Sequence, residues 1–349
     1  MTATAISAAF AAQAAACDSL GSPFMERLMR LCATQAWPAG AVTDRIHGWT
    51  GDLGPNGQSV PLRLAGALHA LRLQGNTTLA QVYPPQAYDA ATLWAAVTEV
   101  LVSEEAAILH WLDSPPQTNE VRRSAPVIAL GHWLTDRFGL PLRCSELGAS
   151  AGLNLHWDDY ALAVGGQSFG SAAPALMLRP DWTGPLPPQT QPLVSARAGV
   201  DLNPLDPQSP ADRLRLQAYL WPDQPERLAL TEAAIANART PITKGDAIDW
   251  LTGHLDHHAG QVHVLYTTIA WQYLPVALQE RGTAMINAAG RTARDDAPLA
   301  WFGMEPDGAR PGAALTLRLW PGDLTFALGR ADFHGRWVHW NPVQTSKKD

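Results

Sequence analysis

A glycine-rich turn directly after a short apolar segment is the feature that most constrains the fold of this chain. The segment at 140–147 runs into Gly-Ala-Ser-Ala-Gly, in which Gly148, Ser150 and Gly152 alternate with alanines. Because glycine has no Cβ, such a backbone can turn tightly and approach a ligand closely. A helix that follows would offer unpaired N–H groups at its start. The pattern predicts a strand, a tight turn and a helix at a ligand site; simple packing is the alternative role of the glycines.

The rest of the C-terminal part alternates between apolar, β-branched segments and helical segments. We predict strands at 194–201, 242–244, 262–269 and 299–304, and helices over 212–239, interrupted at Trp221-Pro222, and 276–289. Strands that alternate with helices form a parallel sheet covered on both faces. The last segments, 315–319, 324–328 and 336–340, predict a C-terminal antiparallel hairpin with its turn at 321–323. The expected fold class is therefore α/β.

The N-terminal part shows helical rather than strand periodicity. Phe24, Leu28 and Leu31 recur at helical spacing after Ser22-Pro23, which is a typical cap and first turn. We therefore expect an N-terminal helical cap domain over 1–138 and the α/β domain over 139–349. A stretch rich in Gly, Pro and Trp, at about 157–192, is expected to be an insertion into the second domain.

Composition narrows the possible partners. The 349 residues carry a formal net charge of −7 and contain no long basic run, which argues against nucleic acid as the main ligand. A small-molecule or peptide substrate is favoured. Three cysteines without a CxxC pair fit a reducing compartment. The Ala-rich first twenty residues predict a helix rather than a signal peptide, and no apolar stretch of membrane-spanning length is expected. The expected location is cytoplasmic, and the oligomeric state stays open.

Three acidic residues fall at the ends of successive predicted strands. Glu146 ends the first strand, Asp201 ends the second and Asp246 follows the third. Ligands bind at these carboxyl ends in open α/β sheets, where Asp201 would accept both ribose hydroxyls and Asp246 would reach an adenine amine. Each acid has an alternative role as a turn former or a helix cap.

These motifs resemble those of class I S-adenosylmethionine-dependent methyltransferases over roughly 140–345. The resemblance implies a Rossmann-like sheet, S-adenosyl-L-methionine as cofactor, and a cofactor-binding set made of Glu146, Gly148, Ser150, Gly152, Asn154, Asp201, Asp246 and Ala247. Ser150 departs from the family, which has glycine there. The separation of 55 positions between Glu146 and Asp201 also exceeds the usual distance of about 20.

A narrower resemblance covers nearly the whole chain. The segments at 116–121, 146–158 and 221–227 are similar to an uncharacterised bacterial family, domain of unknown function 2332. This resemblance implies the fold and gives no substrate.

Candidate catalytic and substrate-binding residues lie outside the glycine-rich turn. Methyl transfer needs a general base only where the acceptor carries a proton, and the candidates for catalysis are Glu120, Asp158 and Tyr273. The candidates for substrate binding are Gln117, Asn119, Arg123 and Trp157. The alternatives are a helix cap at 117–120, with Thr118 or Asn119 as the N-cap, and packing of the two aromatic residues. The histidines at 254, 257 and 258 lack further ligands in the sequence, so no metal site is expected.

Two other functions compete with methyl transfer. A nicotinamide-dependent oxidoreductase is disfavoured because 148–152 does not form G-x-G-x-x-G. A scaffold or sensor that binds S-adenosylmethionine or a nucleotide without turnover stays open, because no catalytic residue is unmistakable.

Overall fold

The computed structural model describes residues 3–55 and 57–345 and divides them into two compact units. The helical unit contains the chain up to Thr118 together with Ser209–Ala229, and the sheet unit contains Asn119–Gln208 and the chain from Leu230 onward. These units differ from the expected ranges 1–138 and 139–349. The helix that precedes the first strand belongs to the sheet unit, and a later helix returns to the helical unit. Sequence pattern marks where element types change but does not show which core an element joins.

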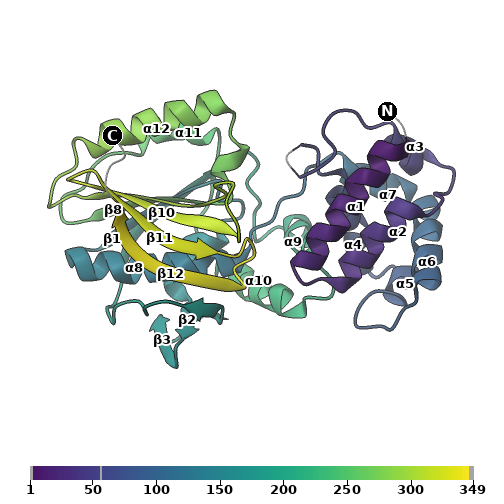
Figure 1. Ribbon diagram of the computed structural model, residues 1–349, viewed down its shortest axis with the longest axis horizontal. Coiled ribbons are helices and arrows are strands. Elements are labelled where there is room, and N and C mark those ends of the chain that lie inside the picture. Colours follow the sequence, from purple (N-terminus) through teal and green to yellow (C-terminus); the bar gives the residue numbers. More distant parts are fainter. Residues whose placement is uncertain (1–2, 56, 346–349) are drawn as a thin grey trace. The chain divides into compact units, whose positions relative to one another are not determined.

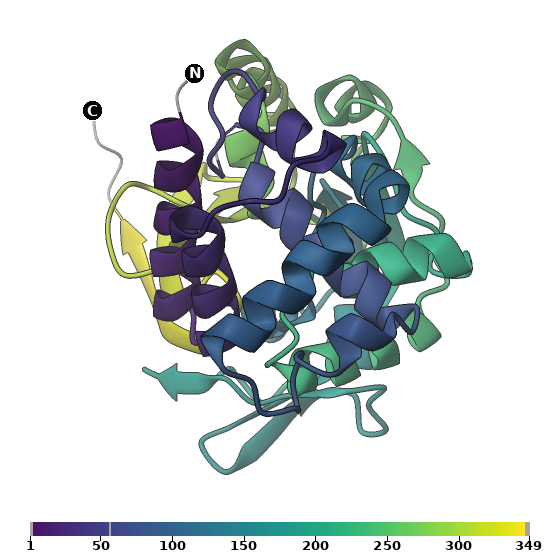
Figure 2. The ribbon, with the colours of Figure 1, turned by 90° about the vertical axis from the view of Figure 1, so that its right-hand side faces the viewer.

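The helical unit is a bundle with a continuous apolar core (Figure 1, Figure 2). Its elements are α1 (Ala3–Ser19), α2 (Pro23–Thr34), α3 (Ala41–His47), α4 (Val60–Leu73), α5 (Thr77–Ala80), α6 (Ala90–Ser103), α7 (Glu105–Leu112), α9 (Pro210–Ala218) and the first residues of α10 (Pro225–Asn237). The predicted start of α2 is confirmed: Ser22 accepts a hydrogen bond from the Met25 amide and proline occupies the first turn. The interruption at Trp221-Pro222 separates α9 from α10.

A nine-stranded mixed sheet forms the frame of the sheet unit. Its order is β5-β12-β11-β10-β9-β8-β1-β6-β7. The strands are β1 (Leu142–Leu147), β5 (Asp181–Thr183), β6 (Val194–Asp201), β7 (Thr243–Lys244), β8 (Val262–Thr268), β9 (Leu299–Glu305), β10 (Ala313–Trp320), β11 (Leu324–Ala331) and β12 (Trp337–Thr345). From β7 to β9 all neighbours are parallel, whereas β9 to β12 form an antiparallel meander. The fold is therefore α/β, with a large and mostly parallel sheet.

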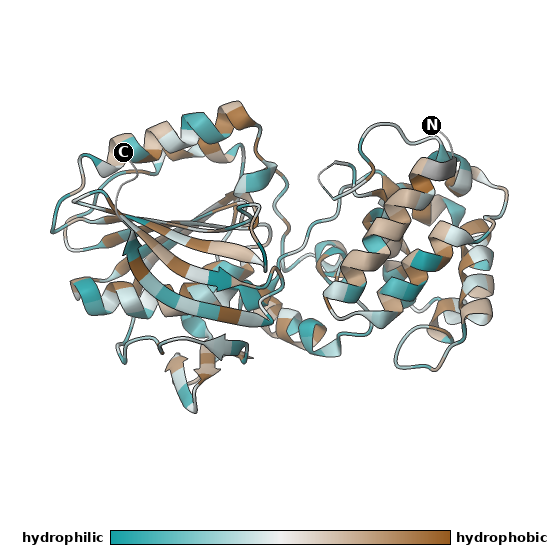
Figure 3. Cartoon of the chain, in the orientation of Figure 1, coloured by the Kyte–Doolittle hydropathy of each residue, from teal (hydrophilic) through white to brown (hydrophobic). Residues whose placement is uncertain are grey.

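Helices cover both faces of this sheet (Figure 1). One face packs against α11 (Ala247–Trp250), η3 (Leu251–Gly253) and α12 (Val276–Gly290), and the other against α8 (Ser124–Phe138), which follows η1 (Val121–Arg123). β8 is buried along its whole length, as expected of a strand covered on both sides. In β12 buried and exposed residues alternate over 338–341, which indicates a strand with one exposed face, and much of the strand is hydrophilic (Figure 3).

The predicted insertion contains a small sheet of its own. β2 (Ala161–Val164) pairs with β3 (Gln167–Gly170) and with β4 (Met177–Leu178), while β5 joins the edge of the large sheet beside β12. None of the helices in the described ranges combines the length and apolar character needed to cross a bilayer.

Candidate functional site

The strand order creates a topological switch point at the carboxyl ends of β1 and β8. From β1 the chain continues to β6 and β7 on one side, while β8 and β9 are added on the other. Open α/β sheets bind ligands in the crevice outside such a point. The loop after β1, residues 148–152, and the loop after β8, residues 269–273, therefore define the candidate site.

The loop after β1 repeats a left-handed backbone conformation at every second residue. The φ angles are +72° at Gly148, +53° at Ser150 and +71° at Gly152. Serine pays a steric cost in this region that glycine avoids. The α-helix expected after the loop is absent; η2 (Leu153–Asp159) is a 3-10 stretch with a kink at His156. These short turns follow the left-handed residue Gly152.

Both glycines of this loop also have a packing reason. A Cβ at Gly148 would lie 2.6 Å from the Cβ of Ala270, in the loop after β8. A Cβ at Gly152 would lie 2.6 Å from Cδ1 of Ile242. These contacts support the packing role of the glycines that the sequence left open. The missing side chain of Gly148 also allows the two loops of the switch point to approach each other.

All six amides from 148 to 153 donate hydrogen bonds inside the protein. Val200 O accepts from the first two, Asp201 Oδ2 accepts from Ser150 N at 2.8 Å, and Ala149 O accepts from Gly152 N. Asn119 Oδ1 accepts from the amides of Ala151 and Leu153, at 3.2 and 3.1 Å. A phosphate bound at a loop of this kind normally takes these donors. The loop is thus satisfied by its own protein and offers no amide of 148–153 to an anion.

Replacing Asn119 with alanine is expected to lower the free energy of unfolding by about 2 kcal/mol, because two buried amides would lose their acceptor and each such loss costs about 1 kcal/mol, at the lower end of the usual range. Urea unfolding measures the change. Asn341→Ala, at an exposed position of β12, is the control and should stay within about 0.5 kcal/mol of the wild type. Equal effects of both substitutions would show that the Asn119 amide does not support the loop.

Glu146 is a buried carboxyl group in the centre of this edge. Only 1% of the residue is exposed, and its Oε2 atom has no hydrogen-bond partner among the described residues. Burial raises the pKa of Glu146 well above its ordinary value; the charge of Asp201 raises it further, and Arg123 opposes the rise. A buried acceptor left without a donor is costly, so this atom is suited to a ligand that brings a donor or a positive charge.

The other two acids of the predicted set are partly engaged in local structure. Asp201 also accepts from the amide of Asn203, at 2.9 Å, and thereby joins the ends of β1 and β6. Asp246 caps α11, with Oδ1 accepting from the amides of Ile248 and Asp249. Ala247 is the first residue of that helix. Since a carboxylate has about four acceptor positions, the turn and cap roles leave capacity for a ligand.

The loop after β8 holds a strained residue and a second buried carboxyl group. Ile269 has φ +56°, a conformation that β-branched residues rarely adopt and that costs of order 1–3 kcal/mol. Glu305, at the end of β9, supports the turn: its Oε1 accepts from the amides of Ala270 and Trp271, at 3.0 and 3.1 Å. Its Oε2 is buried without a partner among the described residues, and burial raises its pKa. The positive φ of Ile269 could not be predicted from the sequence, because a β-branched residue normally indicates an extended or helical backbone.

Arg123 and Tyr273 both lie at the loop after β8. Arg123 donates from Nε to Phe333 O at 2.9 Å and from Nη1 to Thr268 O at 3.3 Å. Tyr273, in η4 (Trp271–Tyr273), is 63% exposed. Desolvation raises the pKa of its hydroxyl, the Arg123 charge lowers it and the Glu305 charge raises it further. The structure thus brings two predicted residues, Arg123 and Tyr273, to the same loop.

The segment before α8 supports the loop after β1 through hydrogen bonds to Asn154, at the start of η2. Asn154 donates to Glu120 O at 3.3 Å and accepts from Ser124 Oγ at 2.7 Å. Glu120 itself is 2% exposed and caps η1, with its Oε1 accepting from Arg122 N. A cap therefore exists, but its residue is Glu120 rather than Thr118 or Asn119.

Gln117 is half-buried in the helical unit, and its substrate role stays a prediction.

Asp158 and Trp157 are engaged in the interior of the sheet unit. Arg197 Nη2 lies 2.7 and 2.6 Å from the two carboxylate oxygens of Asp158. Arg197 pairs with Cys144 in the middle of the sheet, away from its carboxyl edge. Trp157 is 1% exposed and fills the space left by the missing Cβ of Gly131 in α8. Trp157 therefore has the surroundings of a core residue, whereas Asp158 is partly exposed and held in an ion pair.

The histidines at 254, 257 and 258 have separate surroundings. His254 stacks on Trp250, with ring centroids 3.7 Å apart, and His257 Nε2 lies 2.9 Å from Ala289 O. In the described ranges no group of three His, Cys, Asp or Glu side chains is arranged to hold a metal ion.

The fold and this edge define an α/β protein whose switch point carries the buried side chain of Glu146 and the half-buried Glu305, each with one buried carboxyl oxygen that has no partner among the described residues. The chain belongs to the family described as uncharacterized proteins conserved in bacteria (DUF2332), which matches residues 7–340. A search of curated proteins and a search of solved structures each gave no significant match.

Proposed function

We propose that this protein is a Rossmann-like methyltransferase that binds S-adenosyl-L-methionine at the carboxyl edge of β1, β6 and β7 and acts on a small-molecule or peptide acceptor. The observation that carries the proposal is Glu146, whose buried Oε2 has no partner among the described residues. A ligand with a positively charged ammonium group would provide that partner. The parallel order from β7 to β9, followed by antiparallel strands, supports the sheet that the resemblance implies.

The chemistry of the site residues fits this cofactor. Its ammonium group, ribose hydroxyls and adenine amine are all donors, and the strand ends carry acceptors: Glu146 for the ammonium, Asp201 for the ribose and Asp246 for the amine. The cofactor lacks a phosphate, so a loop whose amides are already used is no obstacle to binding. When bound, S-adenosylmethionine supplies an electrophilic methyl group attached to a sulfonium.

The residues after β8 are suited to holding the methyl acceptor. Catalysis of methyl transfer is mainly alignment of the nucleophile with exclusion of water. Tyr273 and Val276, which are 63% and 70% exposed, and Leu202 after β6, at 60%, offer apolar contacts for an acceptor at this edge. Where the acceptor carries a proton, Glu305 Oε2 would accept it; the raised pKa of Glu305 brings this carboxyl closer to the range useful for a base. The Tyr273 hydroxyl, whose pKa is raised, keeps its proton and would orient the acceptor by a hydrogen bond.

A scaffold or sensor that binds the cofactor without turnover is the second candidate. Two of the predicted catalytic residues already have structural duties, since Glu120 caps η1 and Asp158 holds Arg197. The nicotinamide-dependent oxidoreductase is less well supported, because a dinucleotide needs loop amides for its pyrophosphate and those of 148–153 are already engaged.

Titration calorimetry with S-adenosylmethionine, S-adenosylhomocysteine and NAD tests the proposal. We expect micromolar dissociation constants, about −8 kcal/mol, for the first two compounds and no saturable binding of NAD. Binding of NAD alone would favour the oxidoreductase. Failure of all three to bind would overturn the cofactor assignment, whereas binding without turnover of any acceptor would favour the sensor.

A further inference from the structure

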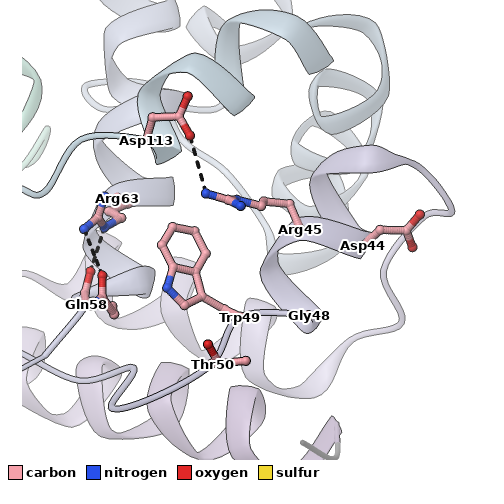
Figure 4. Close-up of a pocket in the computed structure, with 8 residues that line it drawn as sticks. All are labelled: Asp44, Arg45, Gly48, Trp49, Thr50, Gln58, Arg63 and Asp113. Atoms are coloured by element: carbon pink, nitrogen blue, oxygen red, sulfur yellow. Dashed lines mark hydrogen bonds and ion pairs between the residues drawn. The ribbon is translucent and has the colours of Figure 1, made fainter.

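The helical unit contains a cavity of about 510 Å³ beside the start of α4 (Figure 4). It is lined by side chains from α3, the loop that follows it, α4 and the end of α7, all within one unit. The volume lies in the range of small-molecule sites, about 300–1,000 Å³. Five polar residues of the lining surround the ring of Trp49: Arg45, Thr50, Gln58, Arg63 and Asp113.

Arg63 is a buried cation without a counter-charge. Only 6% of the residue is exposed, and no carboxylate of the described residues lies within ion-pair distance of it. Its three nitrogens donate to neutral acceptors: Nε to Gln58 O at 2.7 Å, Nη1 to Leu112 O at 2.8 Å and Nη2 to Gln58 Oε1 at 3.3 Å. A guanidinium has five N–H groups, so one remains on each terminal nitrogen. A buried charge of this kind is stabilised by an anion that reaches it.

Arg45 brings a second guanidinium to the same ring. Arg45 and Arg63 lie 4.8 and 5.2 Å from the centroid of Trp49, distances typical of cation–π contacts. Burial lowers the pKa of Arg63, and the charges of Arg215 and Arg45 lower it further, while Tyr219 and Asp113 oppose them. Two positive groups therefore face one small volume.

The acidic residues of the cavity leave this charge incompletely balanced. Asp113 is 3.4 Å from Arg45, and both side chains are more than half exposed, so the pair is weak and easily exchanged. Asp44 points away from the ring and from both guanidinium groups in Figure 4. Neither carboxylate of the cavity lining therefore forms an ion pair with Arg63.

We propose that this cavity is a binding site for a small oxyanion, a carboxylate or a phosphate monoester, held between Arg63 and Arg45. The guanidinium fork matches the geometry of either anion, and the Thr50 hydroxyl lies in the lining as a further donor. An apolar part of the ligand would contact the Trp49 ring. The oxygens of the ligand would take the place of the Asp113 carboxylate at Arg45. They would also supply the missing negative charge at Arg63.

Calorimetry with inorganic phosphate and with benzoate as separate probes tests this site, with the indole N–H resonance of Trp49 reporting where each probe binds. We expect saturable binding of at least one probe, with a shift of that resonance. Arg45→Gln should weaken binding about tenfold, the effect of losing a charged hydrogen bond. Arg45 is half-exposed, so this variant is expected to fold. Arg30→Gln, which removes another exposed arginine of an ion pair in the same unit, is the matched control and should change nothing.

The two probes separate the sources of the anion: preference for phosphate indicates a phosphate monoester, and preference for benzoate indicates an aromatic carboxylate. Absence of saturable binding of both, or equal affinities in the wild type and Arg45→Gln, would overturn the proposal. The result is independent of methyl-donor binding, because the probes bind to the helical unit and S-adenosylmethionine is proposed to bind to the sheet unit.

Discussion

Replacing Glu146 with glutamine is expected to weaken S-adenosylmethionine binding by about tenfold to a hundredfold. Glutamine keeps the shape of the side chain and removes the charge that would face the ligand ammonium, and a hydrogen bond to a charged group contributes about 1.5–3 kcal/mol. Titration calorimetry of the wild type and Glu146→Gln gives the ratio directly. Unchanged affinity would remove the observation on which the cofactor assignment depends.

The control for this substitution is a glutamate of the same unit without a buried environment. Glu280 lies on the exposed side of α12, and Glu280→Gln removes one negative charge without touching the carboxyl edge. Its affinity for S-adenosylmethionine should equal that of the wild type. A loss in both variants would indicate that overall charge, rather than the Glu146 carboxylate, determines binding.

The same variant should change how stability depends on pH, with a sign set by the raised pKa of Glu146. Below the ordinary value of 4.5, the folded and unfolded chains both carry the proton, and wild type and Glu146→Gln differ little. As the pH rises past that value, the unfolded chain loses the proton first, so the folded chain binds more protons and its stability falls until the raised pKa is passed. Glutamine lacks this fall. Urea unfolding over a pH series should therefore show Glu146→Gln gaining on the wild type toward higher pH; parallel profiles would contradict a buried, uncompensated carboxyl group.

The order of elements in the sheet unit could be predicted because each strand has a local signature. The strand at 194–201 was predicted with the bounds that the structure has, and 262–269 differs from β8 by a single residue. The segment 262–268 is rich in β-branched residues, and 194–201 begins with an apolar residue after Pro192 and ends at an acid, both of which indicate strands. The C-terminal hairpin is likewise present, extended to a meander by β12.

The contacts of the candidate site could not be predicted in the same way, because they join residues far apart in sequence. Asn119 was expected to contact a substrate, yet its Oδ1 accepts from Ala151 and Leu153, more than 30 positions later. Asp158, a candidate catalytic residue, pairs with Arg197, which lies 39 positions away. A polar side chain looks the same in sequence whether it binds a ligand or a backbone amide. The choice depends on tertiary structure alone.

The largest loss of stability is expected from Trp157→Ala. The indole is fully buried between α8 and the sheet, where a Cβ on Gly131 would come within 2.3 Å of the ring. Truncation of a buried tryptophan costs about 3–5 kcal/mol, through lost apolar burial and the cavity left behind. Urea unfolding at neutral pH measures the loss.

Trp271→Ala is the comparison that separates a core role from a substrate role for Trp157. Trp271 is half-buried at the candidate site, between Trp301 and Gly282 of α12, and its truncation should cost less than that of Trp157. If Trp157 contacted the acceptor, its replacement would impair methyl transfer while stability changed by less than about 1 kcal/mol. The core role requires the opposite: a large loss of stability, with S-adenosylmethionine affinity of the remaining folded protein near that of the wild type. Burial of 99% of the residue makes the second outcome the expected one.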